Sequence, residues 1–187
     1  MFPSGVLVKA RLDDLVSNLP EILVLYGPPG LKAAVVEGDH DPDPNETLVL
    51  EQWSETWCLL SVNDNENLTA LVVESLSGTE VVSEFLTCSY TPAAGEYSYA
   101  LFRRGEMLES FECRGPSMEI VNFRSEIRKV PLQSILRASE FMVDSMKEHG
   151  VDPDSGVEDR SGKAMIRVDF PGKRKFWHVL LGAVSKR

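Results

Sequence analysis

An alternation of apolar and polar side chains between Tyr97 and Cys113 predicts a long β-hairpin. Alternate residues of a strand point to opposite faces, so the set from Tyr97 to Arg103 shares one face and the set from Ser98 to Phe102 shares the other. The return strand from Glu106 to Cys113 alternates in the same way. Arg104-Gly105 supplies the turn, because glycine tolerates the positive φ of tight hairpins. The pattern is typical of an antiparallel sheet with one buried face.

Two stretches repeat apolar residues every three or four positions and predict helices at 65–77 and 132–148. Asp64 to Asn67 offers capping side chains for the first helix, and Gly78 is placed to end it. Pro131 suits the first turn of the second helix, and Gly150 follows as a stop signal. The first stripe consists of Leu68, Leu71, Val72 and Leu76, and the second of Leu132, Ile135, Leu136, Ser139, Met142, Val143 and Met146.

The rest of the pattern is mostly strand-like. Strands are expected at 6–12, 32–37, 47–50, within 53–62, and at 79–88, 118–123 and 163–170. A short helix at 14–19 is expected to end at Pro20, and the apolar run 21–26 suits either a buried strand or a short helix. These elements predict an α+β fold, a mostly antiparallel sheet with the two main helices packed on one face. We expect a single domain over residues 1–187, with an acidic mobile loop near 151–162.

Composition restricts the function more than the fold. The 187 residues carry a net charge of −10 and a hydrophobic content of 43%, which indicate a globular protein and argue against general nucleic-acid binding. The charge suits a basic protein partner as well as simple solubility. Because no apolar stretch reaches membrane-spanning length and the first residues lack a signal-peptide pattern, we expect a cytoplasmic protein without a membrane association. Three widely spaced cysteines, Cys58, Cys88 and Cys113, indicate reduced core thiols rather than a zinc site.

Two segments are similar to known binding loops but lack residues that those loops require. Gly27-Pro28-Pro29-Gly30 lies before Lys32, but a phosphate-binding loop needs Gly directly before that lysine and Ser or Thr after it. The acidic run 39–43 contains Pro42 and is followed by Pro44, and it lacks the glycine and terminal glutamate of a calcium loop. We therefore predict no cofactor, no metal and no catalytic residue. The alternative is a small enzyme whose site is assembled from scattered residues, such as His40, Cys58 or His178 with nearby acids.

Two further features indicate contact surfaces. The segment Lys163 to Arg187 holds seven of the nineteen Lys and Arg residues, so it either contacts an anionic partner or closes the core. A candidate interaction surface comprises Trp53, Trp57, Tyr90, Tyr97 and Glu109. The alternative is that the aromatic residues belong to the core and that Glu109 lies on the solvated face of a strand. Our leading hypothesis is a non-catalytic protein-binding module, such as an acidic inhibitor of a basic protein. A homodimer through an open sheet edge, for instance at the hairpin, is a further hypothesis.

The central segment resembles a pattern found in uncharacterised bacterial proteins. It combines a helix ending near Gly78, a strand, a loop, and the hairpin motif Tyr-x-Leu-Phe-x-x-Gly-x-x-x-x-x-Phe from Tyr99 to Phe111. The resemblance covers about a quarter of the chain. It implies a bacterial cytoplasmic protein of unknown function and carries no activity. Some small acidic bacterial proteins are immunity proteins that neutralise toxins, an analogy consistent with the inhibitor hypothesis.

Overall fold

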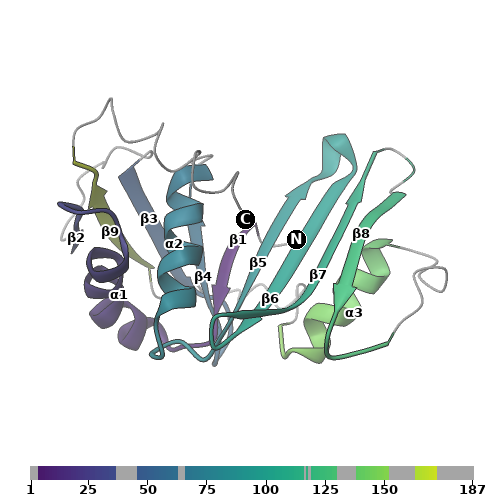
Figure 1. Cartoon of the computed structure of the whole chain (residues 1–187), viewed down its shortest axis with the longest axis horizontal. Helices are drawn as coiled ribbons and strands as arrows, with labels where there is room; N and C mark the ends of the chain where they lie inside the picture. Colours follow the sequence, from purple (N-terminus) through teal and green to yellow (C-terminus); the bar gives the residue numbers. More distant parts are fainter. Residues whose placement is uncertain are drawn as a thin grey trace.

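The computed structural model describes residues 4–36, 46–62, 66–115, 117, 119–129, 138–151 and 163–171. Its nine strands form one sheet in the order β2-β9-β3-β4-β1-β5-β6-β7-β8, and every neighbouring pair is antiparallel (Figure 1). The strands are β1 Gly5–Val8, β2 Lys32–Val35, β3 Thr47–Gln52, β4 Cys58–Val62, β5 Glu84–Thr91, β6 Glu96–Arg103, β7 Glu106–Arg114, β8 Glu119–Ser125 and β9 Lys163–Asp169. The α+β class with an antiparallel sheet is therefore confirmed.

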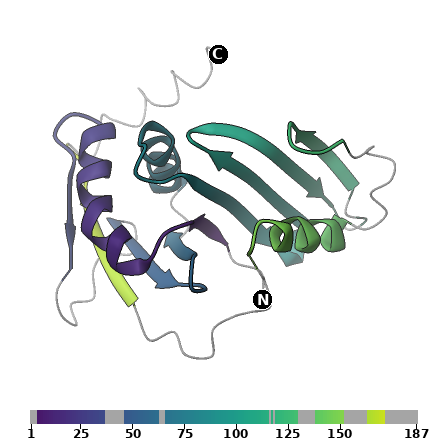
Figure 2. The same ribbon diagram turned by 90° about the horizontal axis from the view of Figure 1, so that it is seen from below.

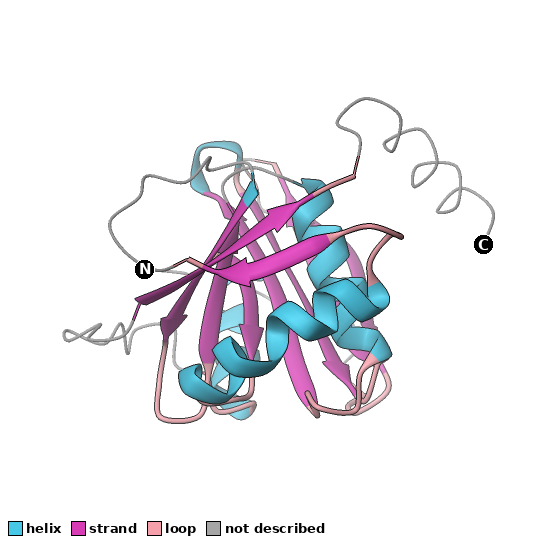
Figure 3. Ribbon diagram, turned by 90° about the vertical axis from the view of Figure 1, so that its left-hand side faces the viewer, coloured by secondary structure: helices cyan, strands magenta, loops and turns pink. Residues whose placement is uncertain are grey.

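The sheet has a hydrophobic cluster on each face, and β1 contributes to both. Val6 and Val8 pack with the helices α1 (Leu12–Tyr26) and α2 (Glu66–Gly78), whereas Leu7 packs with α3 (Ala138–Glu148). The helices accordingly lie on opposite sides of the sheet (Figures 2 and 3). The prediction that the two main helices share one face is not confirmed. An apolar stripe shows that a helix is covered on one side, but not which face of the sheet covers it.

The helix α1 corrects the prediction that a helix over 14–19 ends at Pro20, and it selects the helix of the two alternatives for 21–26. It runs through Pro20 without a break, although proline removes a backbone hydrogen bond and costs about 3 kcal/mol inside a helix. Its buried residues are Leu15, Leu19, Ile22 and Leu23, which form one stripe at helical spacing. Burial of a leucine or isoleucine stabilises by about 1.5–3 kcal/mol each. Together these side chains offset the cost of Pro20, so the helix ends only at Gly27.

The helix α2 confirms the first predicted helix, and its predicted apolar stripe is buried. Of the second predicted helix, residues 138–148 form α3, and 132–137 lie outside the described residues. The acidic segment 152–162 and the tail from 172 also lie outside them, so the predictions made for both remain untested. Within the part of the chain that is described, no helix has the length and apolar character needed to cross a bilayer.

The strand predicted at 79–88 begins later than expected, at Glu84. The hydroxyl of Thr79 accepts a hydrogen bond from the backbone N–H of Val81 at 3.2 Å, which folds this segment into a turn. Val81 is 64% exposed, so its β-branched side chain does not mark a buried strand. A Thr side chain that accepts a hydrogen bond from a nearby backbone N–H competes with extended structure. The strand therefore begins only after this segment.

The hairpin of β6 and β7 is confirmed. Arg104 and Gly105 have φ values of 51° and 78°, as a tight turn between two strands requires. Both strands also have an outer neighbour, β5 for β6 and β8 for β7. The hairpin therefore has no open edge, and a dimer formed at the hairpin itself does not fit this topology. The outermost strands of the described sheet are β2 and β8.

The hairpin turn packs tightly against the end of α2, so a side chain larger than glycine has no room at Gly105. A Cβ atom added at Gly105 would lie 2.3 Å from the backbone oxygen of Ser77, whereas one added at Gly115 would meet nothing within 4 Å. Both glycines have similar positive φ values, 78° and 81°. We expect Gly105→Ala to lower the free energy of unfolding by about 1–3 kcal/mol more than Gly115→Ala, since only the former adds a clash. Equilibrium urea unfolding of both variants measures this difference, and equal losses would contradict the packing described here.

Candidate functional site

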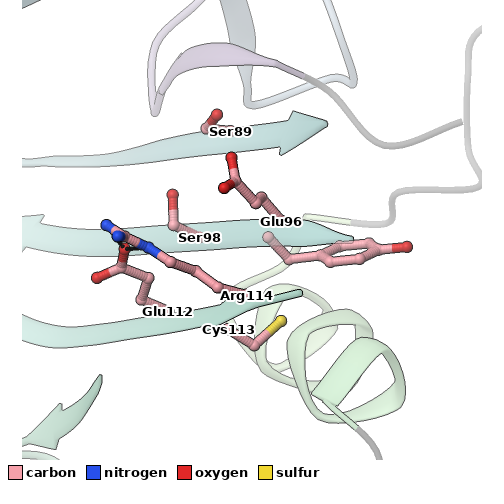
Figure 4. Close-up of a pocket in the computed structure, with 7 residues that line it drawn as sticks. Ser89, Glu96, Ser98, Glu112, Cys113 and Arg114 are labelled. Carbon is pink, nitrogen blue, oxygen red and sulfur yellow. Dashed lines mark hydrogen bonds and ion pairs between the residues drawn. The ribbon is translucent and has the colours of Figure 1, made fainter. Parts of the chain in front are cut away.

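A polar pocket of about 340 Å³ lies at the end of the strands β5, β6 and β7 (Figure 4). Ser89, Ser98 and Glu112 form a row across the three strands, because Ser98 pairs with Ser89 on one side and with Glu112 on the other. Directly opposed residues of an antiparallel sheet point to the same face, so the three side chains share one face. Glu96, two residues before Ser98, joins them on that face. The lining comprises Ser89, Glu96, Tyr97, Ser98, Glu112, Cys113 and Arg114.

One of the two carboxylates in this pocket has a cationic partner among the described residues, and the other has none. The Nε of Arg114 donates to Glu112 at 2.6 Å, and this pair is partly exposed to solvent. The carboxylate of Glu96 points into the pocket beside Ser98 (Figure 4). Among the described residues no cation pairs with Glu96. The pocket thus offers a carboxylate and two serine hydroxyls beside an already neutralised ion pair.

The other face of the same strands carries Tyr90, Tyr97 and Cys113, and Cys113 and Tyr97 pack there in the cluster beneath α3. The rings of Tyr90 and Tyr97 lie 4.6 Å apart, and a hydrogen bond between their hydroxyls, with burial, raises the pKa of Tyr97 to about 12. Cys113, opposite Tyr97, is fully buried, and burial raises the pKa of its thiol. A reactive cysteine needs a lowered thiol pKa. Cys113 is therefore a packed thiol on the α3 side of the sheet and does not supply a nucleophile.

A buried ion pair lies on the same face, between the sheet and α3. Glu109 is fully buried, and the guanidinium Nε of Arg128 donates to its carboxylate at 2.6 Å. The hydroxyl of Tyr99 donates to the same carboxylate, and Arg128 also donates to Ser145 at 2.6 Å and to Glu148 at 2.8 Å. Burial alone would raise the pKa of Glu109, but the hydrogen bonds from Arg128 and Tyr99 hold it below its ordinary value. Since each charged group has partners, this cluster anchors α3 and is not a binding site.

His149, just after α3, makes stability sensitive to acid. Its Nε2 atom is buried without a hydrogen-bond partner among the described residues, and burial lowers its pKa below 6.5. The carboxylates of Glu109, Glu84 and Glu148 oppose this shift, while Arg128 adds to it. As pH falls, the unfolded chain protonates this imidazole first, so stability present above the unfolded pKa is lost. Glu109, whose pKa is also lowered in the fold, adds a second loss below its ordinary value of 4.5.

We therefore expect the free energy of unfolding to decrease from about pH 6.5 downward, with a further decrease below about pH 4.5. Urea unfolding at pH 5 and pH 7.5 measures the first phase. The variant His149→Gln should lose that phase and keep the second. A wild-type protein whose stability is unchanged between these two pH values would contradict the buried, neutral imidazole.

The structure separates the residues predicted for an interaction surface. Trp53 and Trp57 are 4% and 1% exposed and pack in the cluster beneath α3, and Glu109 is enclosed by its ion pair. Tyr90 and Tyr97 are half-buried, contact each other and lie beside the pocket. Trp53, Trp57 and Glu109 therefore do not share an exposed surface with the two tyrosines. The sequence analysis did not identify Glu96, Ser98 and Arg114 as pocket residues. The alternation of Glu96 and Ser98 with Tyr97 and Tyr99 was an available signal, whereas Arg114 had none.

The residues considered for an enzyme are not brought together in the described structure. Cys58 is buried, and burial with the nearby Asp13 and Asp14 raises the pKa of its thiol to about 12. His40 and His178 lie outside the described residues, as does the acidic run 39–43. In the ranges that are described, no group of three His, Cys, Asp or Glu residues is arranged to hold a metal ion. Comparisons with protein-family models, curated proteins and solved structures found no match to this chain.

Proposed function

We propose that the chain is a non-catalytic protein-binding module that receives a basic side chain of its partner in the pocket of β5–β7. The observation that carries this proposal is the carboxylate of Glu96, which points into the pocket beside Ser98 without a described cation (Figure 4). A lysine or arginine side chain would pair with Glu96, and the hydroxyls of Ser89 and Ser98 would accept further hydrogen bonds. The pocket lies on a sheet face where its strand residues remain partly exposed, so a partner has access.

Two general properties support this proposal. The net charge of −10 would steer a basic partner toward the protein and increase its association rate. The pocket lining is polar and rigidly positioned, because its residues lie on strands rather than on loops. An inhibitor of a basic protein is the simplest form of such a module. We place it in the cytoplasm, since Cys58, Cys88 and Cys113 are all free and buried, as expected in a reducing compartment.

Capture of partners from source-cell lysate tests the assignment when pocket variants are compared with matched controls. Glu96→Lys reverses the carboxylate, and Ser98→Trp fills the pocket. Glu74→Lys on α2 makes the same charge change at another exposed site, and Ser17→Trp on α1 adds the same side chain at an exposed helical position. We expect a basic protein that wild type and both controls retain and that both pocket variants lose by about tenfold or more.

Equal capture by all five proteins would show that the retained protein does not use this pocket. Capture that survives 1 M salt unchanged would also contradict the proposal, because an exposed ionic contact is screened at that ionic strength. Thermal unfolding of each variant should accompany the capture. A variant that unfolds at lower temperature than the controls would not count as a loss of binding.

A further inference from the structure

The strand β8 ends the described sheet on the side opposite β2, and no described strand pairs with its outer backbone groups. Seven residues long, it runs Glu-Ile-Val-Asn-Phe-Arg-Ser from Glu119 to Ser125. An open edge strand presents a row of N–H and C=O groups on which another strand can form hydrogen bonds. Val121 is 54% exposed on this strand, where a buried strand would cover it. This edge can therefore pair with a further strand.

A bulge in β8 decides which side chains share a face. Asn122 pairs with Glu112 and Ile120 with Cys113, so Val121 is an extra residue without a partner on β7. As a result Ile120 and Phe123, which are separated by three positions, both pack toward the cluster beneath α3. Glu119 and Arg124 lie on the other face, opposite Arg114 and Ser110 of β7. Glu119 and Arg124 are both exposed, and Ile120 and Phe123 are only half-buried.

These positions make the edge complementary to itself. If two copies of β8 pair antiparallel about a two-fold axis between Val121 and Asn122, Glu119 lies opposite Arg124 of the second copy. Ile120 then lies opposite Phe123 of the second copy, and the symmetry repeats both contacts. Each opposed pair shares a face, which is where cross-strand charge and apolar pairs stabilise a sheet. We propose that β8 is the interface of a symmetric homodimer in this register.

Two observations favour this edge and this occupant. The apolar pair would complete the burial of Ile120 and Phe123, whose rim at the edge is otherwise left in water. The other edge, β2, is four residues long with the sequence Lys-Ala-Ala-Val, so it has no acidic side chain to oppose its own lysine. The existing contacts of β8 do not prevent the pairing, because Arg124 and Glu126 form an exposed ion pair that exchanges readily. The inference is independent of the function proposed for the pocket.

Charge exchange across the two-fold axis provides the test. The variant Glu119→Arg places two arginines opposite each other at both ends of the interface, and Arg124→Glu places two glutamates there. Each variant alone should therefore dimerise at least about tenfold more weakly than wild type. An equimolar mixture of the two restores both ion pairs and should form a heterodimer about as readily as wild type forms its homodimer. Glu74→Arg, a reversal at an exposed position of α2, is the matched control.

Sedimentation equilibrium over a wide concentration range, with one variant fluorescently labelled in the mixture, measures these states. We expect a concentration-dependent dimer, because a single strand pair buries less surface than a standard interface. A monomeric wild type at all concentrations would overturn the proposal. So would a dimer that Glu119→Arg and Arg124→Glu leave unchanged, and so would a mixture that remains as weak as either variant.

Discussion

The variant Arg128→Met is expected to lower the free energy of unfolding by about 3–5 kcal/mol at neutral pH, because it leaves the buried carboxylate of Glu109 without its cation. Glu109 is fully buried, and the side chain of Arg128 is only 18% exposed, so solvent would not replace the lost partner. The loss also removes the hydrogen bonds from Arg128 to Ser145 and Glu148, which hold α3 on the sheet. Equilibrium urea unfolding at pH 7 measures this effect.

A second substitution separates the charge from the packing. Adding Glu109→Gln to Arg128→Met removes the unpaired charge, and the amide still accepts a hydrogen bond from Tyr99. The double variant should recover about half of the lost stability or more. Arg167→Met is the control, since Arg167 pairs with Asp169 at 2.8 Å and both side chains are exposed, so its loss should cost less than about 1 kcal/mol. Equal losses for Arg128→Met and Arg167→Met would contradict the buried ion pair.

The second large effect is expected at Trp57. This side chain is among the largest that are fully buried, and it packs with Leu7 and the methionines of α3. Truncation of a buried tryptophan leaves a cavity, so Trp57→Ala should lower the free energy of unfolding by about 3–5 kcal/mol. Tyr97→Ala, at a half-buried position beside the pocket, should cost clearly less. Urea unfolding followed by circular dichroism measures both.

The stability of Trp57→Ala also shows whether Trp57 belongs to the core or to a contact surface. If Trp57 were a contact residue at a surface, Trp57→Ala would keep the free energy of unfolding of the wild type and would lose binding to a partner protein. The structure instead predicts a loss of stability in Trp57→Ala and a loss of binding in the pocket variants. An unchanged unfolding free energy for Trp57→Ala would contradict the position of this residue in the core.

The elements that could be predicted from sequence are those whose signals are local. The hairpin follows from alternation and from a glycine with positive φ, and α2 follows from a stripe that is buried as expected. The continuous helix α1 could not be predicted, because the burial that offsets Pro20 comes from distant parts of the chain. The sheet face on which α3 packs could not be predicted either, because it also depends on distant parts of the chain. Val6-Leu7-Val8 is apolar throughout, so the sequence offers both faces of β1 equally to a helix.

The candidate site shows a similar division. The alternation of Tyr97 with Ser98 separates polar from aromatic residues on β6, but the row of Ser89, Ser98 and Glu112 exists only through the register of three strands. Glu109 and Glu112 lie on opposite faces of β7, and the ion pair of the buried Glu109 depends on Arg128, 19 residues further along the chain. The bulge between Leu101 and Phe102 changes the register of β6 and β7 near Glu109, and sequence alternation does not reveal it.

The most direct test of the proposed pocket is an NMR titration of the isotope-labelled protein with acetyl-lysine methylamide and with acetyl-arginine methylamide. Norleucine of the same form, which lacks the charge, is the control compound. We expect saturable shifts at the amides of Glu96, Ser98 and Glu112 with the cationic compounds only, in the millimolar range expected for a single ion pair. The shifts should vanish in Glu96→Gln. Equal shifts with norleucine, or shifts that persist in Glu96→Gln, would contradict a pocket that binds a basic side chain.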